Sequence, residues 1–178
     1  MAKDINDNFG TTPTLPDKDI VKSQYKCMAQ ITTEASGKIN GDSQVVGYET
    51  WVELVNYEQR MSRDFDAQNT LIGTPKCEYF RLTTLWTSGG MVPLVQSLFT
   101  GEKVVMAEIH CLKAMAGKIE PALQITLENA IVLDNYILYS HVAGPLLCMD
   151  IRPKIYRVLD NTKKQEFAYD LTKLMKVG

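Results

Sequence analysis

The sequence predicts a mainly β fold: an antiparallel β-barrel, made of two packed sheets, with one short α-helix on its flank. Apolar and polar residues alternate in short segments from Tyr25 to Leu174, which is the period of half-buried strands. Turns rich in Gly, Pro, Asn or Asp separate these segments, and a single stretch has helical spacing instead. Roughly seven strands, one helix and no internal repeat favour a barrel or sandwich of antiparallel strands.

The expected strands follow one another along the chain at residues 25–32, 48–57, 77–87, 103–113, 122–133, 147–159 and 166–174. The fourth and fifth are expected to pair as a long hairpin across a short turn. Residues 77–87 are expected to form a half-buried strand, with Arg81 and Thr83 on one face. In residues 147–159 apolar side chains alternate with Asp150, Arg152 and Lys154. Pro153 lacks the amide that a central strand uses, which indicates a strand edge or a bulge.

The cleanest alternation lies in residues 122–133 and predicts which side chains face the core. The polar side chains of this strand, Gln124, Thr126 and Glu128, are expected to face outward. The inward row is expected to contain Leu123, Ile125, Leu127, Ile131 and Leu133.

The helix is predicted after the Ser88-Gly89-Gly90 breaker. Pro93 suits its first turn and Gly101 suits the position after its end. A helix of about two and a half turns is unstable alone, so its apolar stripe must pack on a sheet. That helix-packing stripe consists of Met91, Leu94, Val95 and Leu98.

Length and charge limit the possible organisation and partners. The 178 residues are enough for one domain with its own core. Residues 1–22 have little to bury and are expected to form a flexible N-terminal arm, with the folded domain spanning residues 23–178. The net charge of -2 gives no reason to expect nucleic acid or an anionic membrane as a partner.

The N-terminus has no apolar signal-peptide core, and no apolar run is long enough to insert in a membrane. The protein is therefore expected to be made in the cytosol and, where it leaves the cell, to do so without a cleaved signal.

Few residues point to chemistry. The four cysteines show no CxxC spacing and are expected to be reduced core residues. Trp51 and Trp86 are likewise expected to lie in the core. His110 and Cys111 are neighbours in a strand and should point to opposite faces, which argues against a nucleophile pair. Because no catalytic, cofactor-binding or metal-ligating set is recognisable, the chain is expected not to be an enzyme and to need no cofactor.

Residues 58–76 show neither strand nor helix periodicity and are expected to form a long loop. Its apolar side chains are spaced among charges, a composition suited to a subunit interface with a polar rim. A closed ring needs two different complementary patches on each subunit, and this loop is expected to supply one of them. The predicted interface residues are Arg60, Met61, Arg63, Phe65, Leu71 and Ile72.

Several short motifs follow one another in a characteristic order. Residues 37–43, "GKINGDS", match the pattern G-x-I-x-G-[DE]-S after the first strand. Residues 83–103, "TTLWTSGGMVPLVQSLFTGEK", combine a strand and a helix closed by Thr-Gly-Glu-Lys, and the segments "AEIHCLKA", "LQITLENAIVL" and "MDIRPKIYRVLDN" come after them. In this order and spacing the motifs resemble the haemolysin-coregulated protein (Hcp) family of type VI secretion systems.

The resemblance implies a structural protein that forms hexameric rings, which stack into a hollow tube driven through a contractile sheath. The partners it implies are other copies of the same chain, the sheath, spike and baseplate proteins of the device, and effector proteins in the lumen. It also implies assembly in the bacterial cytoplasm and export with the device. A phage-type tail tube protein and a monomeric β-barrel that binds a ligand remain as alternatives.

Overall fold

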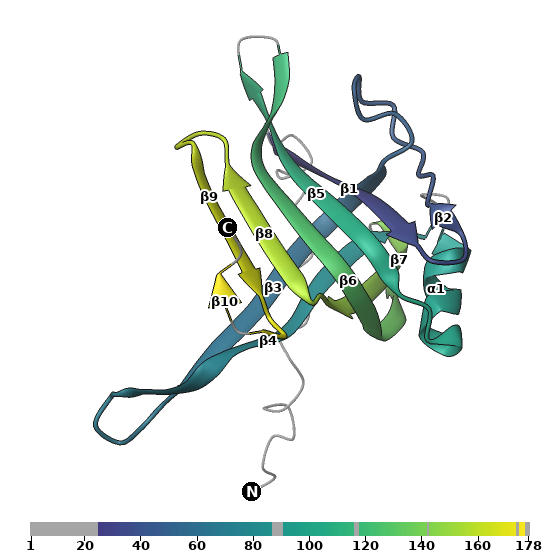
Figure 1. The fold of residues 1–178 in the computed structure, drawn as a ribbon. Coiled ribbons are helices and arrows are strands. Elements are labelled where there is room, and N and C mark those ends of the chain that lie inside the picture. Colours follow the sequence, from purple (N-terminus) through teal and green to yellow (C-terminus); the bar gives the residue numbers. More distant parts are fainter. Residues whose placement is uncertain (1–24, 87–90, 116–117, 142, 174, 177–178) are drawn as a thin grey trace, which may run out of the picture.

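The computed structural model describes residues 25–86, 91–115, 118–141, 143–173 and 175–176. These residues form an antiparallel β-barrel with one short helix, which confirms the predicted fold class (Figure 1). The predicted N-terminal arm, residues 1–22, and the breaker at residues 88–90 lie outside the described residues. The elements are β1 (Tyr25–Thr33), β2 (Gly37–Lys38), β3 (Val52–Phe65), β4 (Leu71–Leu85), α1 (Met91–Thr100), β5 (Val104–Met115), β6 (Lys118–Ser140), β7 (Gly144–Arg152), β8 (Ile155–Asp160), β9 (Gln165–Asp170) and β10 (Met175–Lys176).

The barrel is closed by a ring of hydrogen-bonded strands. The sheet runs β10-β9-β8-β6-β5-β1-β3-β4-β7, and an additional pairing of β7 with β6 joins its end to its middle. Every pairing is antiparallel, including the predicted hairpin of β5 with β6. Closure pairs the strands of the ring on both sides, which removes exposed sheet edges there.

Strand β6 makes this closure possible because it pairs with three strands. Its first part lies between β5 and β8, and its second part continues along β7. Between the two parts, Asn129 has a φ of 51°, in the left-handed region that Asn tolerates better than most residues. The strand thereby leaves one layer of the barrel and enters the other.

The same residue overturns part of the predicted inward row. Ile125 and Leu127 are buried as expected, but after Asn129 the buried side chain is Ala130, and Ile131 is 43% exposed. The alternation changes phase because a left-handed residue rotates the strand relative to its own pleat. The inward assignment of Ile131 is therefore wrong, and Leu133 is half-buried.

The barrel part of β4 and most of β7 are buried on both faces, so the half-buried interpretation of residues 77–87 is wrong there. Phe80 and Leu82 belong to the main core, but Arg81, Thr83 and Asp150 on the opposite face are buried too. Arg81 Nε and Nη2 donate to the two carboxylate oxygens of Asp150, each at 2.7 Å. This bidentate ion pair joins residues directly opposite each other on β4 and β7 and allows both charges to be buried.

The helix closes the interior between the layers of the barrel. Leu94 is buried in the main core, where it meets side chains from β1, β3, β4 and β7 around a void of about 10 Å³. Val95 packs against the same core and Leu98 is half-buried, whereas the side chain of Met91 lies outside the described residues. The helix thus contributes Leu94 and Val95 to the core of the barrel, while Val92 and Phe99 remain exposed.

One glycine of the connector after β1, Gly41, is required by close packing. An added Cβ on Gly41 would lie 2.3 Å from the carbonyl oxygen of Trp51, closer than any real contact. The amide of Gly41 donates to the carbonyl of Thr50 at 2.7 Å, and Ile39 enters the main core. The motif is therefore a structural clamp that fastens the connector beside the start of β3.

We expect Gly41→Ala to lower the free energy of unfolding by about 3 kcal/mol, because backbone must move to admit the methyl group. Gly47→Ala is the matched control: Gly47 has a φ of 83° but open space around its Cβ position, so about 1 kcal/mol is expected. Urea denaturation followed by circular dichroism measures both, and equal losses would contradict the clamp.

We expect Leu94→Ala to lower the free energy of unfolding by about 3 kcal/mol, because it leaves a cavity that the surrounding strands cannot fill. Val92 on the same helix is 59% exposed, and Val92→Ala should change stability by less than about 0.5 kcal/mol. Denaturant midpoints of the two variants test the helix as a plug of the barrel.

Candidate assembly interface

The segment expected to be a long loop is a β-hairpin. Residues 58–76 form the far ends of β3 and β4, which pair from Leu54 with Thr84 out to Phe65 with Leu71. In Figure 1 these ends extend from the barrel as a two-stranded ribbon, which we call the arm and define as residues 59–77. The loop assignment is wrong because two register shifts within the segment, at Arg60/Met61 and Ser62/Asp64, hide its alternation.

The turn at the tip of the arm is held by Asp66. Its Oδ1 accepts hydrogen bonds from the amides of Gln68 and Thr70, at 2.9 and 2.7 Å. Asn69 takes a φ of 60°, and its amide donates to the carbonyl of Asp66 at 3.0 Å. Asp and Asn are favoured at such positions because they accept local backbone bonds and tolerate left-handed conformations.

All six predicted interface residues lie on the arm, and its apolar side chains are exposed. Phe65 is 58% exposed, Leu71 51%, Ile72 44% and Met61 39%. Arg60 Nε lies 2.8 Å from Glu78 Oε2 on the opposite strand. Lys76 pairs with Asp64 in the same way, so the arm carries apolar groups beside charges of both signs.

The arm has little to stabilise it in an isolated chain. None of the main core side chains of the described residues comes from residues 59–76. Two-stranded hairpins without a packed face are marginally stable in water. The apolar side chains of the arm are therefore not covered by the barrel.

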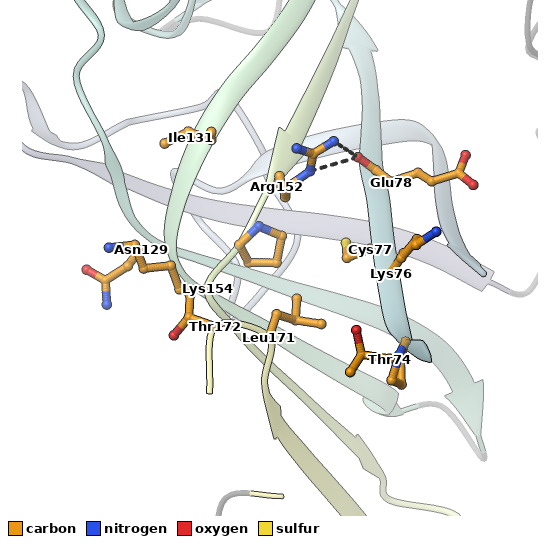
Figure 2. A pocket seen from close by; sticks show the side chains of 12 residues that line it. Thr74, Lys76, Cys77, Glu78, Asn129, Ile131, Arg152, Lys154, Leu171 and Thr172 are labelled. Carbon is orange, nitrogen blue, oxygen red and sulfur yellow. Dashed lines mark hydrogen bonds between the residues drawn. The ribbon is translucent and has the colours of Figure 1, made fainter. Parts of the chain in front are cut away.

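An open groove of about 530 Å³ lies where the arm meets the barrel. Figure 2 shows Lys76 and Cys77 from the arm on one side and Asn129 and Ile131 from β6 on the other. The guanidinium of Arg152 donates to the carbonyl oxygen of Glu78 through Nε and Nη2, at 3.2 and 3.1 Å. This bond holds the root of the arm against the joint between β7 and β8.

The other residues considered for chemistry form structural contacts. His110 Nδ1 lies 3.0 Å from the hydroxyl of Tyr48, and its ring packs with Trp51 on the outer face of the sheet. Burial lowers the pKa of His110 below its usual value, which favours the neutral ring. The sulfur of Cys111 lies on the opposite, barrel-facing side, against Cys27, so the prediction that His110 and Cys111 point apart is confirmed.

The described residues contain no group of three or more side chains that could hold a metal ion. Within that same part of the chain, no helix combines the length and apolar character needed to cross a membrane. The void beneath Leu94 has about the volume of one water molecule, so the barrel interior at that point leaves no room for an organic ligand.

The comparison with known families matches residues 30–152 to the family described as "Type VI secretion system effector, Hcp". The chain belongs to the Hcp family of type VI secretion proteins. The family resemblance of the sequence is thereby confirmed. No curated protein matches the chain by sequence.

Solved structures of Hcp proteins share the fold. The crystal structure of one Hcp protein has a TM-score of 0.75 at 16% identity, covering 83% of this chain and 98% of that one. A mutant of Hcp1 from E. coli EAEC 042 pathovar has a TM-score of 0.74 at 18% identity, covering 82% and 98%. The secreted protein Hcp3 from Pseudomonas aeruginosa has a TM-score of 0.64 at 16% identity, covering 82% and 97%.

We expect the arm to contribute little to the stability of the barrel. Phe65→Ala should lower the free energy of unfolding by less than about 1 kcal/mol because the ring is exposed. Phe80→Ala on the same hairpin is the matched control, since Phe80 is 0% exposed and its loss should cost about 4 kcal/mol. Thermal and urea unfolding compare the two, and a large loss in Phe65→Ala would show that the arm packs on its own barrel.

Proposed function

We propose that the protein is the structural tube subunit of a type VI secretion device and assembles into hexameric rings that stack into a hollow tube. Membership of the Hcp family places it in a type VI secretion context. The exposed apolar arm is the observation that carries the assembly proposal. It provides a projecting patch that an isolated subunit does not bury.

Ring formation needs a patch that fits a different surface of the next copy. A contact of this head-to-tail kind repeats until the ring closes. The arm projects beyond the barrel, so it can reach a neighbouring subunit or the next ring without strain on the core (Figure 1). Its apolar tip between charged flanks has the composition of an interface centre with a polar rim.

The tight interior argues against the alternative of a monomeric ligand-binding barrel. Barrels that hold a ligand leave an inner cavity, whereas the core here is packed with apolar side chains around Leu94. A phage-type tail tube would use the same fold and the same assembly. The family match favours the secretion device over the phage.

The remaining partners follow from this role. As a tube subunit, the protein meets the sheath, spike and baseplate proteins of the device and carries effector proteins in the lumen. Assembly takes place in the cytoplasm, and export with the device needs no signal peptide. A structural role of this kind involves no catalytic step.

The first test is the mass of the purified protein by light scattering coupled to size exclusion, with negative-stain images of the peak. We expect six times the chain mass of 20.0 kDa and annular particles. A single-chain mass at every concentration, without annular particles, would contradict the ring.

The arm is tested by Phe65→Glu and Leu71→Glu, each of which puts a charge into the proposed apolar contact. We expect both variants to weaken ring formation at least tenfold, equivalent to about 1.4 kcal/mol, because the charge must be desolvated. Gln68→Glu in the turn adds the same charge outside the apolar patch and should leave the rings intact. Unchanged circular dichroism controls for folding, and intact rings in both arm variants would overturn the role of the arm.

A further inference from the structure

Two cysteines face each other inside the barrel wall. Cys27 on β1 is the direct partner of Cys111 on β5, next to the pair of Ala29 with Ile109. Their sulfur atoms are 3.8 Å apart. Both are half-buried free thiols, and Cys27 packs against the main core.

The positions of the two residues are compatible with a disulfide. Directly opposed residues of antiparallel strands have Cα atoms about 4.5 or 5.5 Å apart, and both values lie in the range of disulfides, roughly 4.4–6.8 Å. The sulfur atoms have to approach from 3.8 Å to about 2.05 Å, a step that side-chain rotation supplies without a change of strand register.

The two thiols are not equivalent. The hydrogen bond between the two sulfurs lowers the pKa of Cys111, while that same bond and burial raise the pKa of Cys27. Cys111 is therefore the first of the pair to become a thiolate, which is the nucleophilic form. Cys27 is already in place to attack once the sulfur of Cys111 has been oxidised.

We propose that Cys27 and Cys111 are an oxidation site that forms a reversible intrachain disulfide with a small two-electron oxidant such as hydrogen peroxide. The Cys111 thiolate attacks one peroxide oxygen, the O–O bond breaks, and a sulfenic acid and hydroxide form, which takes up the proton that left the thiol. The Cys27 sulfur then attacks the sulfur of Cys111, loses its proton, and displaces the hydroxyl group as water. Overall, two thiols and one peroxide give one disulfide and two waters.

The bond would tie two neighbouring strands of the closed ring to each other. Formation of the disulfide does not depend on the proposed function. The time at which it forms rests on that function, since a tube subunit exported by the device passes from a reducing cytoplasm to an oxidising exterior, where disulfides persist.

The test uses the full chain, reduced, freed of reductant and treated with a small excess of hydrogen peroxide. After denaturation and alkylation, intact-mass spectrometry counts the free thiols, which should fall from four to two. Peptide mapping should join the peptides that contain Cys27 and Cys111, and a phosphine reductant should restore all four thiols. Restoration separates the disulfide from irreversible oxidation of cysteine and from oxidation of methionine.

The variant Cys77→Ser/Cys148→Ser retains the pair and should lose both of its remaining thiols under the same treatment. Cys27→Ser should form no intrachain bond. Should Cys27→Ser fail to fold, the wild-type chain and the double variant still decide the matter. A persistent count of four thiols, or a map that joins any other cysteines, would overturn the proposal.

Discussion

The fold depends on one constraint: a single strand has to belong to both layers of the barrel. β6 meets β5 and β8 before Asn129 and continues along β7 after it, and this continuation joins the two ends of the sheet. Without the change of direction at Asn129, β7 would have no partner on that side and the sheet would stay open. The close packing of Leu94 follows from this closure. In the closed barrel, side chains of β1, β3, β4 and β7 surround Leu94.

The arm depends on the same closure. β3 and β4 are anchored where they take part in the barrel, by the Phe80 and Leu82 core and by the buried pair of Arg81 with Asp150. Arg152 adds a second fixed point through the carbonyl of Glu78. Beyond these residues the two strands continue from the barrel wall and, among the described residues, pair only with each other. A rigid base with an unburied tip is what a projecting contact surface requires.

Much of this fold could be predicted from the sequence because its core strands obey simple alternation. The segments around Ile125, Leu127 and Ile151 were assigned correctly as strands, and so was the helix that contains Leu94. The conformation of Asn129 could not be predicted, because Asn occurs in strands and turns alike and only the three-strand pairing requires a positive φ there. The burial of Asp150 was missed since its partner, Arg81, is far away in the sequence and close only in the folded sheet.

The strands of the arm could not be predicted from hydrophobic periodicity. Its residues are exposed on both faces, so selection for a buried face imposes no alternation, and bulges near Arg60 and Ser62 shift what alternation remains. The available signal was the turn, where Asp66 and Asn69 suit a hairpin end. The mixture of apolar and charged side chains in this segment could be recognised from its composition alone, because composition does not depend on strand register.

An arm of this kind also exposes backbone. From Gln59 to Cys77 each of its strands pairs with the other alone, among the described residues, so each has one row of amides and carbonyls open to any extended peptide. Such a row can template β-aggregation. On this arm Pro75 has no amide hydrogen to donate, and Arg63, Asp64 and Lys76 carry charges. Prolines and charges of this kind disfavour the pairing of exposed strand edges with one another.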